Sequence, residues 1–336
     1  MNFWKDLPKP IFVLAPMADV TDAPFRQMIA KYSSHLRKDG TQGGPDVMWT
    51  EFVSADGLIR ATPEGKEKLL ADLIYREEER PIVAQLFSST PEHMEQAAAL
   101  CLELGFDGID INMGCPDKSI EKQGCGSAMI KNPAVAKEII LAAKRGARSD
   151  EPEGIPVSVK TRLGYNHDQL EDWLPAVLSA KPAALILHAR TRKEMSKVPA
   201  RWERVKRAVE IRNELGSDTL ILGNGDALSI ADAEAKVQAT GADGVMLGRA
   251  IFGNPWLFHP EQDLSNVSLE ERLRVLVEHT KLFEEILPFK NFSVMKKHYK
   301  AYVNSFPGAA ELRAELMDKN SGAEIEERIN SFLASL

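Results

Sequence analysis

Cysteine is scarce in this chain, with three residues among 336. No two of them have C-x-x-C spacing, which argues against a disulfide-stabilised scaffold and against a cysteine-ligated zinc site. No apolar run approaches the roughly 20 residues that cross a bilayer. The N-terminal segment lacks the basic flank and the apolar stretch of a signal peptide. We therefore expect a protein of the reducing cytoplasm that binds no metal and no membrane.

Positive charge is also in short supply, because 42 lysines and arginines face 49 acidic residues for a net charge of −7. That sum speaks against nucleic acid, since contact with phosphates requires a local excess of cations. Two stretches are nevertheless basic: residues 190–212, and residues 289–302, where aromatic side chains lie between the lysines. Each stretch could be a solvated helix face or a nucleic-acid contact. The candidate contacts are Arg190, Arg192, Lys193, Lys290, Lys296, Lys297 and Lys300.

Apolar, strand-like runs recur eight times, with helical segments between them. Since each crossover has its own helix, the pattern predicts a parallel (β/α)8 barrel, also called a TIM barrel, rather than an open sheet. Such a barrel takes about 250 residues, which leaves room for a smaller second domain. The predicted strands are residues 11–15, 47–51, 81–87, 108–112, 156–160, 184–188, 220–223 and 244–247.

Helix boundaries in the barrel region carry capping signals. Thr90 and Asn132 each precede a proline and are predicted N-caps, while Gly105, Gly146 and Gly216 occur where helices should end.

The pattern changes after residue 256, and beyond Ser268 only helical periodicity remains. Ser268 and Glu271 have the spacing of a capping box. Further helices are predicted over residues 292–305, 309–317 and 323–336. We therefore predict a barrel domain over residues 1–261 and an all-helical domain, a four-helix bundle, over residues 262–336.

The most informative stretch is residues 109–116, an apolar strand that ends on Asn112, Gly114 and Cys115 before a proline. Barrel enzymes keep their chemistry at the carboxyl ends of strands, so Cys115 is a candidate catalytic acid or nucleophile. A thiol with a pKa of about 8.5 is mostly protonated at neutral pH and can donate a proton to a carbanion. Cys101 lies in a predicted helix as core filling. Cys125, in a glycine-rich loop, is the alternative reactive thiol.

Basic and glycine-rich groups also gather at the predicted carboxyl ends of the strands, although ion pairs and tight turns would account for each one singly. Glycine-rich turns after strands seven and eight are common phosphate sites in barrels. Flavin mononucleotide (FMN) would account for all of these groups together, with Lys160 near the N1 side of the ring. The candidate cofactor contacts are Ala15, Pro16, Met17, Gln85, Lys160, His188, Asn224, Gly225, Asp226, Gly248 and Arg249.

Seven stretches, in order along the barrel, resemble the motifs of the bacterial tRNA-dihydrouridine synthases. They are APMADVTDAPFR (15–26), DINMGCP (110–116), VKTRLG (159–164), HARTR (188–192), GNGD (223–226), GRA (248–250) and NPW (254–256). The resemblance implies an FMN-containing barrel, a C-terminal four-helix domain that grips tRNA, and a protein that acts as a monomer. It also implies that NADPH is the reductant for the C5–C6 double bond of uridine.

The resemblance further implies a role for individual residues. Hydride would pass from reduced FMN to C6 of uracil, and Cys115 would donate the proton to C5. Asn112 and Arg162 match positions that hold the uracil edge. Because uridine is buried in folded tRNA, the base would be extruded into the pocket, an unpairing that costs a few kcal/mol.

The chain departs from the family pattern in two places, and two other functions remain open. Many members carry a tyrosine in the loop where residues 193–197 read KEMSK, and Cys125 is an additional thiol. A small-molecule flavoenzyme such as a dihydroorotate dehydrogenase also ends a strand in Asn-x-x-Cys-Pro, but it has no use for a basic helical extension. The chain could also be an RNA-binding module that keeps FMN only structurally, against which an intact Cys115 argues.

Overall fold

The computed structural model describes residues 2–37, 40–262 and 264–336. They form two compact units. Unit 1 comprises the chain up to Ala18 together with Asp46–Gly248, and unit 2 comprises Asp19–Pro45 together with Arg249–Leu336. The membership therefore differs from the predicted ranges 1–261 and 262–336, because residues 19–45 and 249–261 pack with the C-terminal helices.

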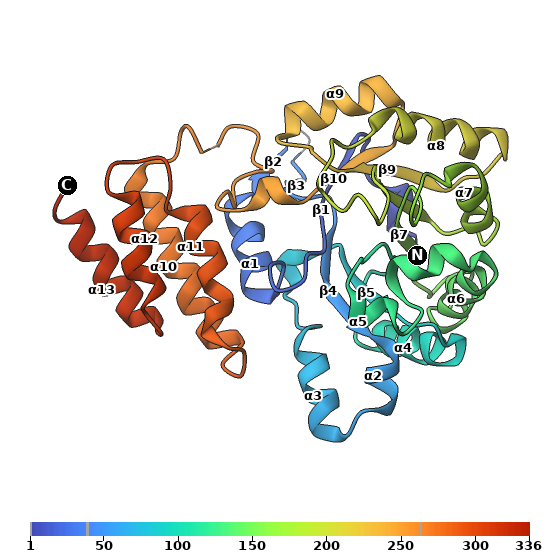
Figure 1. Ribbon diagram of the computed structural model, residues 1–336, viewed down its shortest axis with the longest axis horizontal. Coiled ribbons are helices and arrows are strands. Elements are labelled where there is room, and N and C mark those ends of the chain that lie inside the picture. Colours follow the sequence, from blue (N-terminus) through green and yellow to red (C-terminus); the bar gives the residue numbers. More distant parts are fainter. Residues whose placement is uncertain (1, 38–39, 263) are drawn as a thin grey trace. The chain divides into compact units, whose positions relative to one another are not determined.

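Unit 1 is built on a sheet of eight parallel strands in the order β1-β10-β9-β8-β7-β6-β5-β4 (Figure 1). The sheet edges are joined by backbone hydrogen bonds, from Leu14 N–H to Val47 O at 3.1 Å and from Asp46 N–H to Phe12 O at 2.8 Å. The fold is therefore α/β and TIM-barrel-like, as predicted. The strands are β1 (Ile11–Leu14), β4 (Met48–Ser54), β5 (Ile82–Phe87), β6 (Gly108–Met113), β7 (Val157–Arg162), β8 (Ala184–His188), β9 (Leu220–Asn224) and β10 (Gly244–Leu247).

Helices connect these strands, and Figure 1 shows α6, α7, α8 and α9 on the outside of the sheet. The α-helices of unit 1 are α2 (Ala55–Arg60), α3 (Pro63–Ala71), α4 (Pro91–Glu103), α5 (Lys118–Glu121), α6 (Pro133–Gly146), α7 (Leu170–Leu178), α8 (Trp202–Glu214) and α9 (Ile230–Thr240). Short 3-10 turns occur at Phe3–Lys5, Glu77–Glu79 and Gly126–Lys131.

The predicted caps are mostly confirmed. The Asn132 side chain accepts from Val135 N–H at 3.4 Å, and α6 ends at Gly146. Gly105 and Gly216, which follow α4 and α8, have φ angles of +80° and +59°. Thr90 is the N-cap residue of α4, as predicted, but its side chain makes no capping hydrogen bond. Its own N–H donates to Ser88 Oγ at 2.9 Å.

An apolar cluster fills the sheet of unit 1. Buried side chains from β1, β5, β8, β9 and β10 form one cluster with Trp4 and Trp49, among them Val13, Ile186 and Met246. Burial of this kind contributes about 1.5–3 kcal/mol per large side chain. The apolar filling provides a rigid base for the polar residues on the same strands, which we describe below.

Unit 2 is mostly helical. Its helices are α1 (Ala23–Tyr32), α10 (Leu269–Ile286), α11 (Lys296–Tyr302), α12 (Ala309–Met317) and α13 (Gly322–Leu333), with 3-10 turns at Arg249–Ile251 and Phe292–Met295. Ser268 accepts from Glu271 N–H at 3.1 Å, which confirms that cap. A short antiparallel pair, β2 (His35–Leu36) and β3 (Gln42–Gly43), had no sequence signal because each strand has only two residues.

Aromatic rings from three segments pack at the centre of unit 2. The Phe25 ring lies 5.0 Å from His279 and 4.8 Å from His298, between ring centroids, and the two histidines are 4.7 Å apart. Tyr299 and Tyr302 are also fully buried. The interpretation of residues 289–302 as RNA-facing aromatics is therefore wrong for both tyrosines, which belong to the core.

The two buried histidines are neutral. Their ring nitrogens find no hydrogen-bond partner among the described atoms. Burial lowers the pKa of His298 to about 3 and the pKa of His279 well below its usual value of 6.5. Both histidines bind a proton in the unfolded chain below pH 6.5 but stay neutral in the folded protein. The free energy of unfolding therefore falls as the pH drops below 6.5.

We predict that His298→Phe removes part of this acid sensitivity. One such histidine costs about 2 kcal/mol of stability between about pH 7 and pH 5, and phenylalanine has no proton to take up. Urea denaturation at both pH values measures the difference, with the exposed His167→Gln as control. Equal pH dependence in wild type and His298→Phe would contradict this account.

Candidate active site

The register of the parallel strands brings the predicted site residues to one end of the sheet. Asn112 of β6 pairs with Lys160 of β7, Arg162 with His188 of β8, and His188 with Asn224 of β9. These residues end their strands or precede the end by one or two positions, so their side chains gather at the carboxyl edge of unit 1. This is where barrel folds place their active sites.

The turn after β6 is fixed by a side chain. Asn112 Oδ1 accepts hydrogen bonds from Gly114 N–H at 3.1 Å and from Cys115 N–H at 2.9 Å. A second loop holds the turn from below, because Ser127 N–H donates to Cys115 O at 2.9 Å. Gly126 has φ +59°, and a Cβ there would lie 2.7 Å from Cys115 O. Only glycine allows this approach.

Cys115 is the one half-exposed thiol, since Cys101 and Cys125 are 0% and 1% exposed. It lies against an apolar cluster that includes Phe87 and Ile120. Burial raises the pKa of Cys115, although Arg162 and Lys160 oppose the effect. Burial also raises the pKa of Cys125 to about 11 and that of Cys101 to about 12. At neutral pH Cys115 is therefore a protonated thiol that a ligand in the site can reach.

Lys160 carries an amine whose pKa lies close to neutral pH. Its Nζ donates to Asn224 Oδ1 at 3.3 Å, and Asn224 is itself oriented by donating Nδ2 to Met246 O at 2.8 Å. Burial and the neighbouring Arg162 lower the pKa of Lys160 to about 8. Part of the lysine population is therefore neutral a little above physiological pH.

Arg162 ties the turn after β6 to the loop after β8. Its Nε donates to Gly114 O at 2.7 Å, and its Nη1 donates to Thr191 O and Met195 O, each at 3.2 Å. Burial lowers the pKa of Arg162 to about 10, so the guanidinium remains charged at neutral pH. Because these bonds use Nε and Nη1, the guanidinium can still offer Nη2 to a ligand.

Asp110 and Ser158, to which the sequence analysis gave no role, are hydrogen-bonded to the residues of the site. Asp110 Oδ2 accepts from Gln85 Nε2 at 2.7 Å, and Asp110 Oδ1 accepts from Ser158 Oγ at 2.7 Å. Gln85 Oε1 in turn accepts from Asn112 Nδ2 at 3.1 Å. The sequence did contain a signal for a functional role of Asp110, because it is a carboxylate between Ile109 and Ile111 in a predicted buried strand.

Glycines directly follow β9 and β10, at Gly225 and Gly248. Gly225 has φ +122°, and a Cβ there would lie 2.9 Å from Ala200 Cβ. A Cβ on Gly248 would meet Ala15 Cβ at 3.5 Å and Met17 Sδ at 3.7 Å. Pro16 lies between these two β1 residues in the chain. Backbone N–H groups in glycine turns can bind a phosphate, so this edge is the candidate position for one.

Arg190 differs from the role predicted for it, whereas the cofactor contact predicted for Asp226 stays a prediction. Arg190 is 2% exposed and donates Nε to Val198 O at 2.6 Å. Its guanidinium also pairs with Asp226 and lies 3.1 Å from His188 Nε2. Asp226 further accepts from Ala200 N–H at 2.8 Å. Both residues therefore order the loops around His188, and Arg190 is too buried to contact RNA.

Arg249 follows Gly248 directly but is the first residue of unit 2, at the start of the 3-10 turn Arg249–Ile251. Its predicted contact with a cofactor phosphate remains a prediction from the sequence.

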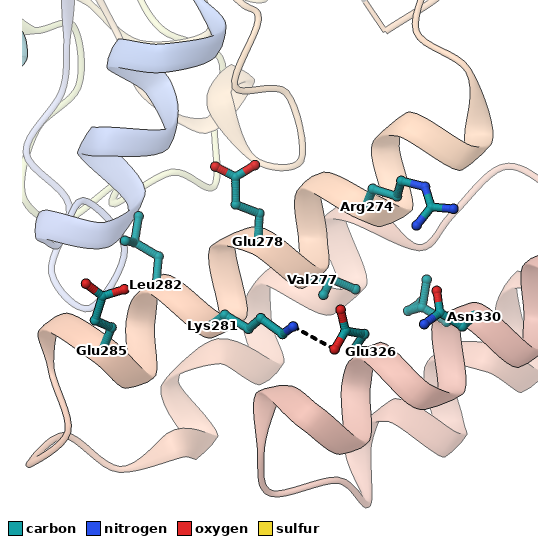
Figure 2. A pocket seen from close by; sticks show the side chains of 9 residues that line it. Arg274, Val277, Glu278, Lys281, Leu282, Glu285, Glu326 and Asn330 are labelled. Atoms are coloured by element: carbon teal, nitrogen blue, oxygen red, sulfur yellow. Dashed lines mark hydrogen bonds and ion pairs between the residues drawn. The ribbon is translucent and has the colours of Figure 1, made fainter.

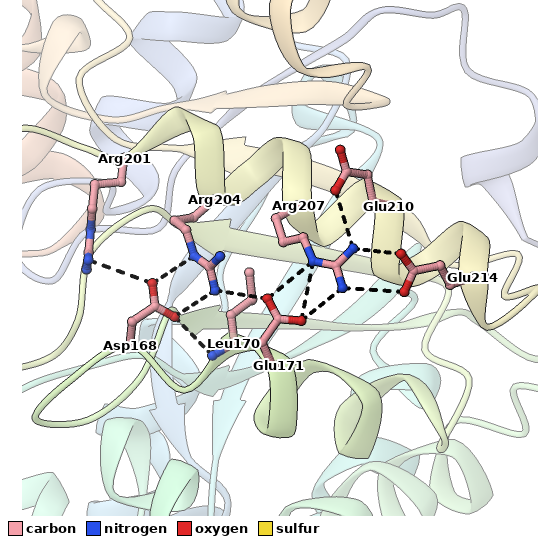
Figure 3. A network of polar contacts seen from close by, with 8 residues as sticks. All are labelled: Asp168, Leu170, Glu171, Arg201, Arg204, Arg207, Glu210 and Glu214. Atoms are coloured by element: carbon pink, nitrogen blue, oxygen red, sulfur yellow. Dashed lines mark hydrogen bonds and ion pairs between the residues drawn. The ribbon is translucent and has the colours of Figure 1, made fainter.

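The basic stretch 190–212 is largely neutralised by carboxylates. Figure 3 shows Arg204 and Arg207 of α8 paired with Glu171 at 3.3 and 3.0 Å, and Arg207 also reaches Glu214 at 2.6 Å. Arg201 and Arg204 share Asp168. All six arginines of the stretch form ion pairs. The α8 arginines Arg204, Arg207 and Arg212 are therefore engaged by carboxylates, and the expected RNA contact of this stretch rests on Arg192 and Lys193.

A smaller basic group lies beside the candidate site. Arg192 pairs with Glu121 and lies 5.1 Å from the Tyr165 ring centroid, and Lys131 Nζ lies 4.4 Å from the same centroid. Lys193 is exposed and makes no ion pair among the described residues. Arg192 and Lys193 therefore remain candidate contacts for a phosphate of the RNA.

In unit 2, Lys290, Lys296 and Lys297 are half-buried and Lys300 is exposed. Lys297 Nζ donates to Asp19 O at 2.5 Å. A hollow of about 360 Å³ between α10 and α13 has a different character (Figure 2). Three glutamates line it, and its Lys281 pairs with Glu326 at 2.6 Å. That hollow is unsuited to phosphates, so Lys290 and the α11 lysines stay the candidate contacts of this unit.

Comparison with known proteins settles the family. The family model for dihydrouridine synthase matches residues 13–335. The chain belongs to the dihydrouridine synthase family. It is 40% identical to a probable tRNA-dihydrouridine synthase 2 of Bacillus subtilis, over 98% of this chain and 96% of that protein. It is also 39% identical to a probable tRNA-dihydrouridine synthase of Staphylococcus aureus, over 100% of this chain and 97% of that protein.

Solved structures agree with the fold of this family member. Histamine dehydrogenase from Rhizobium matches with a TM-score of 0.51 at 12% identity, over 85% of this chain and 50% of that one. An amine oxidase from Pseudomonas geniculata matches with the same TM-score and identity, over 88% and 54%. Among the described residues, no helix is long and apolar enough to span a membrane and no cluster of metal-binding side chains occurs.

We predict that iodoacetamide alkylates only Cys115 in the native protein. Its rate should rise at higher pH than that of a free cysteine, because burial raises the pKa of Cys115. Peptide mass spectrometry over a pH series measures it, with guanidinium-unfolded protein as the control in which all three thiols react. Native labelling of Cys125 ahead of Cys115 would contradict the assignment of burial.

Proposed function

We propose that this protein is an FMN-dependent tRNA-dihydrouridine synthase that uses NADPH to reduce the C5–C6 double bond of uridine in tRNA. One observation carries the proposal. The half-exposed, protonated thiol of Cys115 is held at the end of β6 beside Lys160 and Arg162, in a chain of the dihydrouridine synthase family. In this proposal the protein is a cytoplasmic monomer.

The residues present fit FMN. The backbone of Gly225 and Gly248, with His188, would hold the phosphate, and Ala15, Pro16 and Met17 would pack on the ring. Gln85 and Asn224 would offer amide groups, and the Lys160 ammonium would face the side of the ring that becomes negative on reduction. Arg249 would add a cation to the phosphate. When bound and reduced by NADPH, FMN supplies a hydride to C6 of uracil.

The remaining chemistry belongs to side chains of unit 1. The Cys115 thiol would donate its proton to C5, since it stays protonated at the pH of the cell. Asn112 and Arg162 would hold the polar edge of uracil with the N–H groups not used internally. Because Arg162 also bonds Gly114 O at 2.7 Å, binding at its guanidinium is coupled to the position of the Cys115 turn.

Contact with tRNA would come from the remaining basic groups, namely Arg192, Lys193, Lys290, Lys296, Lys297 and Lys300. The contacts of these side chains with the phosphate backbone of the tRNA would offset the free energy cost of extruding the base, which is a few kcal/mol. The relatives named above are called tRNA-dihydrouridine synthases and match this chain over nearly its whole length, helical C-terminal region included. This favours tRNA over a free pyrimidine as substrate.

We predict that the purified protein forms dihydrouridine in an unmodified tRNA transcript with NADPH, and that Cys115→Ala loses this activity by about 100-fold or more. Dihydrouridine is mapped by the stop of reverse transcriptase after alkaline ring opening. Cys125→Ala is the matched control and should keep the activity, because that thiol is buried with a pKa of about 11. Loss with Cys125→Ala but not with Cys115→Ala would refute the assignment.

We also predict that reversing charge at Lys296 and Lys300 weakens tRNA binding roughly tenfold at low salt and reduces its salt dependence. Flavin content should not change, because neither lysine lies in unit 1. Filter binding across a salt series measures both effects. Arg207→Gln is the control, since its guanidinium is already held by Glu171 and Glu214. An unchanged affinity in the lysine variant would place the RNA surface elsewhere.

A further inference from the structure

We infer that Asp110 is the positioning residue of this site: its buried carboxylate orients the amides of Gln85 and Asn112 and stabilises the charge of Lys160. The inference rests on the proposed function for its catalytic consequence. Its structural part stands on the hydrogen bonds alone.

The chain of bonds from Asp110 to Cys115 is continuous. Asp110 Oδ2 accepts from Gln85 Nε2 at 2.7 Å, and Gln85 Oε1 accepts from Asn112 Nδ2 at 3.1 Å. Asn112 Oδ1 then accepts from Cys115 N–H at 2.9 Å. Each amide both donates and accepts along this path. Turning one amide over would place two donors or two acceptors face to face.

Both ends of the chain fix its direction. At the upper end, the backbone N–H groups of Gly114 and Cys115 can only donate, so Asn112 must present its oxygen. At the lower end, an ionised carboxylate can only accept, so Gln85 must present its nitrogen. Asp110 is the only member that is charged, and its other oxygen is already held by Ser158 Oγ at 2.7 Å. The carboxylate thus selects one of the two amide orientations at Gln85.

Asp110 also acts on the cation of the site. Asp110 is fully buried, and its register partner on β7 is Ser158. Lys160 follows Ser158 by two residues on β7, so both side chains lie on the same face of the sheet. The groups that bear on the charge of Lys160 are Arg162, Asp110 and Cys115. Asp110 supplies a negative charge that favours the ammonium, whereas Arg162 opposes it.

The carboxylate is itself costly to keep charged. Burial raises the pKa of Asp110 to about 6, while Gln85, Ser158 and Lys160 favour the ionised form. Burying a carboxylate is unfavourable unless hydrogen bonds and opposite charge compensate it. Its contacts run to the amides and the lysine of the candidate site, which is the pattern of a positioning residue.

Two substitutions separate the two roles. Asp110→Asn keeps the volume and some hydrogen bonds but removes the charge, so Lys160 deprotonates more readily and the alkaline limb of the activity profile moves to lower pH by about one unit. Asp110→Ala removes the acceptor of Gln85. In that variant the Gly114 and Cys115 amides should exchange their hydrogens about tenfold faster or more, because Asn112 is no longer held.

The experiment measures amide hydrogen exchange by NMR and the pH profile of dihydrouridine formation for wild type, both Asp110 variants and Ser158→Ala. Ser158→Ala is the matched control, because it removes a bond to the same carboxylate but leaves the path to Cys115 intact. It should leave exchange at Gly114 and Cys115 within about twofold of wild type. If Asp110→Ala does not fold, the pH profile of Asp110→Asn decides.

The outcomes distinguish this inference from the proposed function. Faster exchange in the Asp110 variants of a protein inactive on tRNA would support the positioning role and refute the function. An active wild type in which Asp110→Ala leaves exchange at Gly114 and Cys115 unchanged and Asp110→Asn leaves the pH profile unchanged would overturn the positioning role alone.

Discussion

The two backbone hydrogen bonds accepted by Asn112 Oδ1 are the constraint on which the candidate site depends. They hold Gly114 and Cys115 in a turn that a buried parallel strand would not otherwise make at its end. Arg162 bonds to the same turn through Gly114 O, and Ser127 N–H bonds to Cys115 O. The thiol is therefore placed by three separate segments of unit 1. Asn112 in turn depends on Gln85 and Asp110, so the position of the thiol is set by residues buried beneath it.

Electrostatics and burial act together in this arrangement. The same loss of solvent that keeps the Cys115 thiol protonated lowers the pKa of Lys160 to about 8. A proton donor and a cation beside it are both useful to a reaction that adds a hydride and a proton to a double bond. The site thus needs no ionised cysteine, which separates it from cysteine nucleophiles that depend on a lowered pKa.

Much of the fold could be predicted from the sequence because its signals are local. The eight apolar runs became the eight parallel strands, and Asn132 and Ser268 cap their helices as expected. The placement of residues 19–45 could not be predicted, since it depends on packing between Phe25 and two histidines more than 250 residues away. The ion pairs of the basic stretch 190–212 could not be predicted either, because Arg204 and Arg207 pair with Glu171 of another helix. The role of Asp110 was hidden for the same reason, because its partner Gln85 lies on another strand.

The most direct test of the central claim is whether tRNA accepts electrons from the reduced protein. The protein, purified with the proposed FMN bound, is reduced with NADPH without oxygen and mixed with unmodified tRNA or with orotate. Absorbance near 450 nm reports flavin oxidation. The account predicts that tRNA restores the absorbance with one dihydrouridine formed per flavin, and that orotate does not. A flavin that stays reduced with tRNA but is reoxidised by orotate would contradict the account and identify a small-molecule flavoenzyme.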